Sequence, residues 1–327
     1  MPAGMTQSPC LSYNHLMKNK KIYVAGHRGM VGSALVRQLQ DQGYKNLILK
    51  SRDELNLSDT DAVNSFFKTE KPQWVFLAAA KVGGILGNSR YPVEFLLDNL
   101  KIQNNVIEAA YQNGAEKLMF LGSSCIYPRE CPQPIKEDYL LTSALEATNE
   151  PYALAKIAGI KLCEAYNKQY DCNFLSVMPT NLYGENDNYH PENAHVLPML
   201  LARFHQAAVD QQSEVVVWGT GTVRREFLFA DDLADACLYL MANYNADQLN
   251  GIVNIGTGKD CTITELAELI AEVVAYKGKI IYDTTKPDGT PRKLLDVRKL
   301  ENLGWSAKTS LREGIEKTYK LYLVSSI

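Results

Sequence analysis

The sequence predicts an α/β fold: a Rossmann-type doubly wound parallel sheet with a smaller C-terminal substrate lobe that interleaves with it along the chain. Three observations predict this fold. Short apolar runs alternate with helix-like segments, as in repeated βαβ units. A glycine-rich turn directly follows the first apolar run. The length of 327 residues, with 46% hydrophobic and 22% charged side chains, suits a globular chain with a large core.

The first apolar run, Lys21–Ala25, is expected to be a strand, and the segment from Met30 to about Gln42 a helix. The turn between them has glycines at 26, 29 and 32, a GxxGxxG spacing rather than GxGxxG. Glycines permit a tight turn and close approach of the backbone to a pyrophosphate, and the helix N-terminus offers free N–H groups to the anion. The place of the turn between strand and helix favours a dinucleotide site over a plain connection.

The second strand, about Asn46–Lys50, should indicate which dinucleotide binds. An acidic residue at its end would contact the ribose 2′-hydroxyl of NAD, but here Ser51 and Arg52 follow. Arg28 and Arg52 could flank a 2′-phosphate, because a guanidinium binds phosphate through two hydrogen bonds. We therefore expect NADP(H). Asp53 could still face a ribose, and two solvated arginines are the alternative.

The later elements continue the alternation and then loosen after Gly184. Strands Arg225–Phe229 and Ile252–Ile255 are expected to return to the main sheet. We therefore expect three regions. Residues 1–18 are an N-terminal extension, in which Met17 is an alternative start. Residues 19–182 are an NADP-binding domain with returning segments near 225–257, and residues 183–327 are mainly a substrate-binding lobe. The other expected strands are Trp74–Ala79, Lys117–Leu121 and Asn173–Met178, and the expected helices are about Pro92–Asn113 and Pro151–Tyr170.

Composition excludes several classes of partner. A net charge of −3 and a pI near 6.0 give no general attraction to nucleic acid or anionic membrane. No apolar run approaches the ~20 residues needed to span a bilayer, and residues 1–18 lack the features of an import signal. The seven cysteines are scattered without a C-x-x-C pair, which predicts a reducing cytoplasm and neither a disulfide framework nor a metal site.

One short stretch places a serine, a thiol, a phenol and an amine close together: Ser123, Cys125, Tyr152 and Lys156. Tyr152 and Lys156 lie four apart and so share a helix face. An ammonium ~4 Å from a phenol, at an effective dielectric of ~20, favours the phenolate by about 4 kcal/mol, so we expect a lowered pKa for Tyr152. A lone pair at this spacing is more often ordinary helix surface; the glycine turn upstream favours a redox site.

Longer motifs carry a resemblance to a known family. They are Ala25–Ser33, Arg52–Leu57, Ala78–Gly84, Gly122–Pro128, Val177–Gly184 and Lys286–Lys293. Over about Lys20 to Trp305 the chain resembles the extended short-chain dehydrogenase/reductase family, and within it the enzymes that act on a GDP-4-keto sugar. The resemblance implies an enzyme that uses NADPH to epimerise GDP-4-keto-6-deoxy-D-mannose at C3 and C5 and to reduce C4, giving GDP-L-fucose.

The resemblance also implies a homodimer, for which we expect the helices at Pro92–Asn113 and Pro151–Tyr170 to form the interface. Two alternatives stay open at this point. The first is a related nucleotide-sugar 4-epimerase or 4,6-dehydratase. The second is a non-catalytic NADP-sensing protein.

Site residues follow from the resemblance, position by position. Ser123, Tyr152 and Lys156 are the expected reductase triad, in which the hydroxyls stabilise and protonate the C4 oxygen. Cys125 and His195 are the expected acid and base for C3 and C5, since thiol and imidazole ordinarily titrate on either side of neutral pH. The expected cofactor-binding residues are Gly26, His27, Arg28, Gly29, Met30, Val31, Gly32, Arg52, Asp53, Leu55, Ala78, Ala79, Leu121, Lys156, Pro179, Asn181, Leu182 and His195. The expected substrate-binding residues are Ser123, Arg203, Trp218, Arg225, Asp288 and Lys293.

Overall fold

A six-stranded parallel sheet forms the centre of the computed structural model, which describes residues 18–190, 194–286 and 288–325. The predicted N-terminal extension and Met17 therefore lie outside the described residues, apart from Lys18. Strand order across the sheet is β2-β1-β3-β4-β5-β9. The strands are β1 (Ile22–Ala25), β2 (Leu47–Ile48), β3 (Trp74–Leu77), β4 (Lys117–Leu121), β5 (Phe174–Pro179) and β9 (Val253–Ile255).

The order of the strands creates a crevice beside β1. The chain runs from β1 outward to β2 and then returns to β3 on the other side of β1. Connections therefore leave the carboxyl ends of β1 and β3 in opposite directions, which is the point where open α/β sheets bind their ligands.

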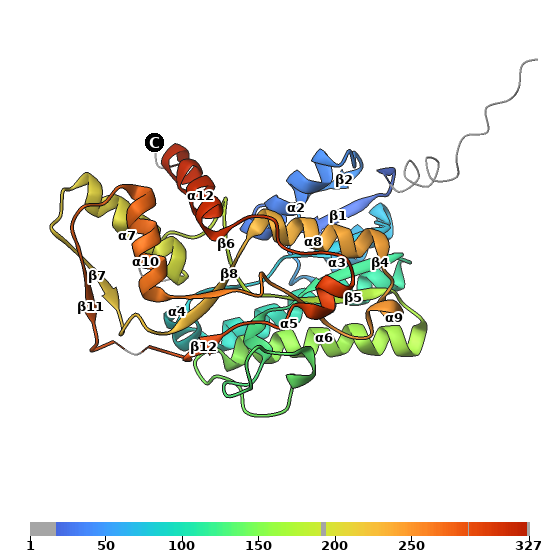
Figure 1. Ribbon diagram of the computed structural model, residues 1–327. Coiled ribbons are helices and arrows are strands. Elements are labelled where there is room, and N and C mark those ends of the chain that lie inside the picture. The colour runs from blue at the N-terminus through green and yellow to red at the C-terminus, as the bar shows by residue number, and fades with distance from the viewer. Residues whose placement is uncertain (1–17, 191–193, 287, 326–327) are drawn as a thin grey trace, which may run out of the picture.

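Helices cover both faces of this sheet (Figure 1). Helices α2 (Met30–Asp41) and α8 (Ala230–Asn243) pack on one face, and α3 (Thr60–Glu70), α5 (Pro92–Gln112) and α6 (Glu150–Tyr170) pack on the other. Alternate residues of β1 enter the two cores: Val24 joins the first and Tyr23 the second. Burial on both faces explains why the strands are continuous apolar runs, and it confirms the predicted doubly wound fold.

The C-terminal lobe has its own strands and core. β6 (Asn181–Tyr183), β8 (Arg224–Phe229), β10 (Asp260–Thr262) and β12 (Arg292–Lys293) form a four-stranded sheet, while β7 (Glu214–Trp218) pairs with β11 (Lys279–Asp283) at the outer edge of the lobe (Figure 1). A third core lies between α7 (Val196–Val209), α10 (Ile263–Val274) and α12 (Leu311–Ser325). The remaining short elements are α4 (Ile85–Arg90), η1 (Ser124–Ile126), η2 (Glu137–Tyr139), α9 (Ala246–Leu249) and α11 (Arg298–Asn302).

The predicted return of Arg225–Phe229 to the main sheet is wrong. This segment is β8, which pairs with β6, β10 and β12 in the lobe. Its first half carries Arg224, Arg225 and Glu226, and such charges do not suit a strand covered on both faces. The elements that do return are α8, which packs against α2, and β9, which pairs with β5 as expected for Ile252–Ile255. The domain boundaries near 182 remain a prediction.

A fully buried carboxylate joins the strands of the lobe. Glu226 of β8 accepts hydrogen bonds from the backbone N–H groups of Thr257 and Gly258, both at 2.7 Å, and of Leu295 at 3.0 Å. These donors lie in the turn after β9 and in the segment after β12. Glu226 therefore fixes the positions of three separate chain segments.

We expect Glu226→Ala to destabilise the fold by about 3 kcal/mol, because several buried N–H groups would lose their acceptor. Urea unfolding followed by circular dichroism measures the change. Glu268→Ala, at an exposed position of α10, is the control and should change stability by less than about 0.5 kcal/mol. Equal stabilities of the two variants would contradict this role of Glu226.

Candidate active site

A cavity of about 580 Å³ opens at the carboxyl ends of the central strands. It lies at the crevice beside β1 and extends along β3, β4 and β5. It is lined by Gly26, Gly29–Gly32, Lys50, Arg52, Leu55–Ser58, Ala78–Val82, Asp98, Ile102, Leu121–Cys125, Tyr152, Lys156, Pro179–Leu182 and His195.

The glycine turn has the geometry of a phosphate-binding loop. Gly26 has a φ of +83°, and a Cβ on Gly32 would lie 2.0 Å from the carbonyl oxygen of Gly26. No side chain caps the N-terminus of α2, so its first N–H groups, at Met30 to Gly32, face the cavity. Nδ1 of His27 is buried without a hydrogen-bond partner in the described part of the chain. Free N–H groups at a helix N-terminus bind a diphosphate, so the residues present fit a dinucleotide.

Basic residues line the end of the cavity next to β2. Lys50 and Arg52 belong to the lining, whereas Arg28 and Asp53 are exposed outside it. Of the predicted pair of arginines, the structure therefore brings only Arg52 to the cavity wall. Lys50, which sequence reasoning did not select, supplies a second cation, and its Nζ is 3.8 Å from Glu54.

All five predicted catalytic side chains line this one cavity. Ser123 and Cys125 lie in the turn after β4, where Ser123 Oγ accepts a hydrogen bond of 3.2 Å from the backbone N–H of Cys125. Tyr152 and Lys156 occupy the first two turns of α6, which starts with Pro151 in the first turn, as predicted. His195 is the N-cap residue of α7. The structure thus assembles groups from three parts of the chain.

The expectation that Lys156 lowers the pKa of Tyr152 is wrong for this geometry. Burial raises the pKa of Tyr152, the neighbouring Cys125 raises it further, and a hydrogen bond with Ser123 opposes both. Lys156 Nζ donates instead to the carbonyl of Leu121 at 2.8 Å and lies 5.8 Å from the centroid of the Tyr152 ring. Burial also lowers the pKa of Lys156 to about 8. Tyr152 is therefore a protonated phenol at neutral pH.

His195 and Cys125 share one cation, Lys293. Lys293 Nζ donates a hydrogen bond of 3.6 Å to Cys125 Sγ. Burial, and next the charge of Lys293, lower the pKa of His195. His195 is exposed and belongs to the cavity lining, so the imidazole is accessible to a bound ligand. At neutral pH the imidazole is uncharged.

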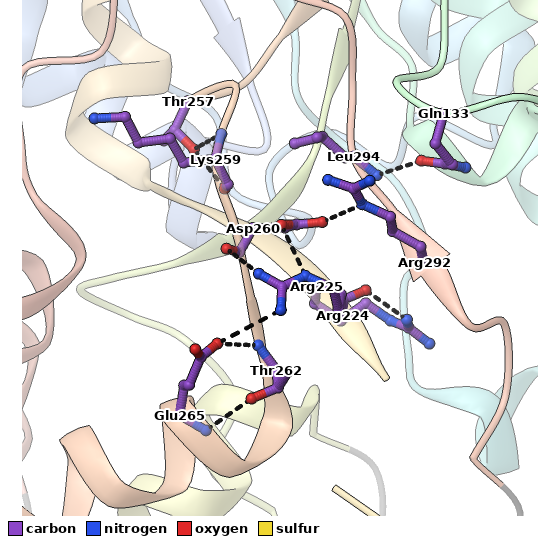
Figure 2. A network of polar contacts seen from close by, with 10 residues as sticks. All are labelled: Gln133, Arg224, Arg225, Thr257, Lys259, Asp260, Thr262, Glu265, Arg292 and Leu294. Atoms are coloured by element: carbon purple, nitrogen blue, oxygen red, sulfur yellow. Dashed lines mark hydrogen bonds and ion pairs between the residues drawn. The ribbon is translucent and has the colours of Figure 1, made fainter. Parts of the chain in front are cut away.

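The predicted substrate residues, apart from Ser123, lie outside this cavity, on the lobe. Register pairs Lys293 with Arg225 and Arg292 with Arg224 across β12 and β8, and paired residues share a face of a sheet. Figure 2 shows that Arg224 and Arg292 both turn toward Asp260, while the guanidinium of Arg225 points away from it. Arg225 and Lys293 are therefore the cations available to a ligand on the other face.

Trp218, Arg203 and Asp288 gather near the end of β7. The guanidinium carbon of Arg203 lies 5.6 Å from the Trp218 ring centroid, and Lys286 Nζ lies 5.8 Å from it. Trp218 itself is 42% exposed, which leaves an aromatic surface for a planar ligand group. Asp288 accepts hydrogen bonds from the N–H and hydroxyl of Thr220, at 2.7 and 2.9 Å, so it is held by protein groups.

Sequence reasoning missed several lining residues. Asp98 and Ile102 lie one turn apart on α5, and Ala80, Lys81 and Val82 continue the predicted segment after β3. The sequence did indicate Ala80, Lys81 and Val82, because they directly follow a predicted strand and ligands bind beyond the carboxyl ends of parallel strands. The other missed residues are Lys50, Asn56, Leu57, Ser58, Gly122, Ser124 and Thr180.

Comparisons with known proteins agree with this geometry. The NAD dependent epimerase/dehydratase family matches residues 22–256. The chain belongs to this family. It is 60% identical over 308 residues to a protein named putative GDP-L-fucose synthase 2 from Arabidopsis thaliana, covering 94% of this chain and 93% of the relative. It is 54% identical over 313 residues to GDP-L-fucose synthase of Escherichia coli (strain K12), covering 94% and 98%.

Two solved structures of family members resemble the fold closely. A GDP-mannoheptose C4 reductase from Campylobacter jejuni with NADP bound has 41% identity and a TM-score of 0.87, covering 94% of this chain and 99% of that one. A GDP-L-fucose synthetase from Naegleria fowleri bound to NADP has 28% identity and a TM-score of 0.84, covering 93% and 94%.

Neither a membrane-spanning helix nor a cluster of metal-binding side chains is present within residues 18–190, 194–286 and 288–325. Among these residues, no helix combines the length and apolar character needed to cross a bilayer. The same part of the chain holds no cluster of three or more His, Cys, Asp or Glu side chains that could bind a metal ion.

We expect Gly32→Ala to weaken both NADPH binding and the fold, because its Cβ would displace the Gly26 carbonyl and widen the turn. NADPH titration by fluorescence and thermal unfolding measure the two effects, with at least about a tenfold loss of affinity. In Gly29→Ala the nearest protein atom would be 3.5 Å from the new Cβ, so its thermal stability should match that of the wild type. Wild-type affinity of Gly32→Ala would contradict the predicted cradle.

Lys156→Met should stabilise the fold at pH 7 by about 2 kcal/mol. Burial lowers the pKa of the ammonium by more than two units, so the charged group costs the folded state more free energy than its hydrogen bond contributes. The folded pKa of about 8 lies below that of the unfolded chain, so the cost is full below pH 8 and fades as pH rises further. Unfolding midpoints at pH 7 and pH 10 test this. Lys161→Met, at an exposed site on α6, should show no such pH dependence.

Proposed function

We propose that this protein is an NADPH-dependent epimerase-reductase that converts GDP-4-keto-6-deoxy-D-mannose to GDP-L-fucose. The observation that carries the proposal is the joint presence of Ser123, Tyr152 and Lys156 with Cys125 and His195 in one cavity. A reductase alone needs only the first three. The names of the relatives at 54–60% identity support the same activity.

Reduction at C4 uses the hydroxyl groups at the end of β4 and on α6. NADPH, bound at the glycine turn, supplies the hydride. Negative charge then builds on the C4 oxygen, where the hydroxyls of Ser123 and Tyr152 donate hydrogen bonds. Because burial keeps Tyr152 protonated, it can deliver its proton to that oxygen. Lys156, fixed to the Leu121 carbonyl, keeps α6 against this strand end and places a charge beside the phenol.

Epimerisation precedes reduction, because it needs the C4 carbonyl. That carbonyl acidifies the protons at C3 and C5, and the same Ser123 and Tyr152 hydrogen bonds stabilise the enolate. Cys125 and His195 exchange the protons: one side chain removes a proton from carbon, and a proton is returned to the opposite face of the ring. An uncharged His195 and a sulfur contacted by Lys293 suit groups that shuttle protons near pH 7.

The GDP group is assigned to the lobe. Arg225 and Lys293 lie on the free face of the β8–β12 sheet, and a guanidinium can bind a diphosphate through two hydrogen bonds. Trp218 offers its exposed ring to the guanine or its ribose, with Arg203 beside it. Asp288 would then position the Thr220 turn rather than contact the sugar directly.

The cofactor is NADP(H); the glycine turn would hold its diphosphate, and Lys50 and Arg52 would bind its 2′-phosphate. The NADP-bound solved structures of family members support this choice, as does the lack of an acidic residue at the end of β2.

We further propose a cytoplasmic homodimer. Exposed apolar side chains on α5 and α6, among them Val93, Leu97 and Leu154, support an interface on these helices. The six cysteines in the described residues are all free thiols, which supports a reducing compartment.

The alternatives are less well supported. A 4-epimerase or 4,6-dehydratase would retain its cofactor and show no net oxidation, and the NADP-sensing alternative gives no reason for Cys125 and His195 to line the cavity. One incubation with GDP-4-keto-6-deoxy-D-mannose and NADPH in heavy water distinguishes these cases. We expect stoichiometric NADPH oxidation and deuterium at C3 and C5; turnover without NADPH oxidation would refute the proposal.

Cys125→Ser and His195→Gln should each reduce deuterium exchange at C3 and C5 by at least about 100-fold, the usual contribution of a general acid or base, while NADPH still binds. Tyr152→Phe should leave binding intact and slow C4 reduction by a similar factor. Nuclear magnetic resonance of the sugar and absorbance at the NADPH band measure the steps separately. Full exchange in both Cys125 and His195 variants would remove these residues from the mechanism.

A further inference from the structure

Lys293 reaches from the lobe to the turn that carries Cys125. Its Nζ donates a hydrogen bond of 3.6 Å to Cys125 Sγ, across 168 residues of sequence. The two side chains come from β12 of the C-terminal lobe and from η1, the short helix after β4. Lys293 is half-buried, so this contact is partly shielded from water.

The charge of Lys293 is not neutralised by a neighbouring carboxylate. Of the other cations of this sheet, Arg224 and Arg292 are both paired with Asp260 on the opposite face (Figure 2). Within residues 18–190, 194–286 and 288–325, no salt bridge joins Lys293 to an acidic side chain. Its ammonium is therefore available to an anion on the cavity side.

Two titratable groups interact with Cys125, and a third interacts with Lys293. Lys293 contacts it directly, and the phenol of Tyr152 is close enough for a charge on the sulfur to raise the pKa of Tyr152. The charge of Lys293 also lowers the pKa of His195, after the larger effect of burial. Ser123 Oγ accepts a hydrogen bond from the backbone N–H of Cys125. This bond fixes the turn and does not involve the sulfur. An ammonium beside a sulfur favours the anionic, proton-accepting form of that sulfur and disfavours a cationic imidazole nearby.

We propose that Lys293 is a positioning residue for the epimerisation, which orients Cys125 and places a positive charge beside its sulfur, where that charge assists proton exchange with the sugar. The proposal rests on the proposed function for the identity of the reaction, and it reassigns Lys293 from the GDP diphosphate to the thiol. Arg225, its register neighbour, is left as the diphosphate cation. In each epimerisation the sulfur takes the proton that carbon loses, His195 returns a proton to the opposite face of that carbon and regains one from solvent, and no oxidant or reductant takes part.

Alkylation by the neutral reagent iodoacetamide reports directly on the anionic sulfur. We expect Lys293→Met to slow modification of Cys125 at pH 7 about tenfold in the NADP-loaded enzyme, and Lys293→Arg to restore most of the rate. Mass spectrometry of the peptide that contains Cys125 separates it from the other cysteines. Arg292→Gln, the adjacent cation facing Asp260, is the matched control and should alkylate at the wild-type rate.

Deuterium exchange at C3 and C5 should fall with the alkylation rate in Lys293→Met, while the KM for the GDP-sugar changes less than about threefold. An unchanged alkylation rate with a tenfold higher KM would overturn the proposal and make Lys293 a diphosphate ligand. If Lys293→Met fails to fold, Lys293→Gln and the Lys293→Arg rescue give the same comparison. Alkylation needs no sugar, so it can be measured independently of the reaction. If Lys293→Met slows alkylation of Cys125 but the wild-type enzyme shows no deuterium exchange at C3 and C5, only the proposed function is refuted.

Discussion

A single buried hydrogen bond, from Lys156 Nζ to the carbonyl oxygen of Leu121, connects two of the three chain segments that carry the proposed catalytic residues. It joins α6 to the end of β4, and so sets Tyr152 of the helix against Ser123 of the strand end. An ammonium in a nearly dry site costs free energy. This destabilisation occurs at the cavity wall, where the charge lies beside the phenol of Tyr152 and can serve the proposed reaction. Such local destabilisation is typical of functional sites.

In the C-terminal lobe, one sheet separates the charges that pair with Asp260 from those proposed to act on a ligand or on Cys125. Because register partners share a face, the pairing of β12 with β8 sends Arg224 and Arg292 to Asp260 and leaves Arg225 and Lys293 on the other side. A slip of one residue in β12 would exchange the two sets. Glu226 is a buried residue of β8 in the same sheet. It accepts hydrogen bonds from the neighbouring segments and so supports that register.

Most of the fold could be predicted from sequence, since apolar runs, the glycine turn and helix-start signals are local. The range of β8 was also predictable, and the charges in its first half are a sequence signal against the doubly covered main sheet; its partners in the lobe were not predictable, because they come from distant parts of the chain. For Tyr152 and Lys156 the spacing gave the shared helix face correctly. It could not give the direction of the pKa shift, which depends on burial. The hydrogen bond between Lys293 and Cys125 joins residues too far apart for any spacing argument.

Helix α8 has a consequence for biosynthesis. It completes the layer over one face of the cofactor sheet, where Leu233 and Cys237 share a core with Met119 and Val177, and β9 closes the sheet edge beyond β5. Both elements are made only after the substrate lobe has begun. A nascent chain that ends before them carries an uncovered apolar sheet. The dinucleotide half therefore cannot be complete on the ribosome until residue 255 has been made, after the first elements of the C-terminal lobe have already been synthesised.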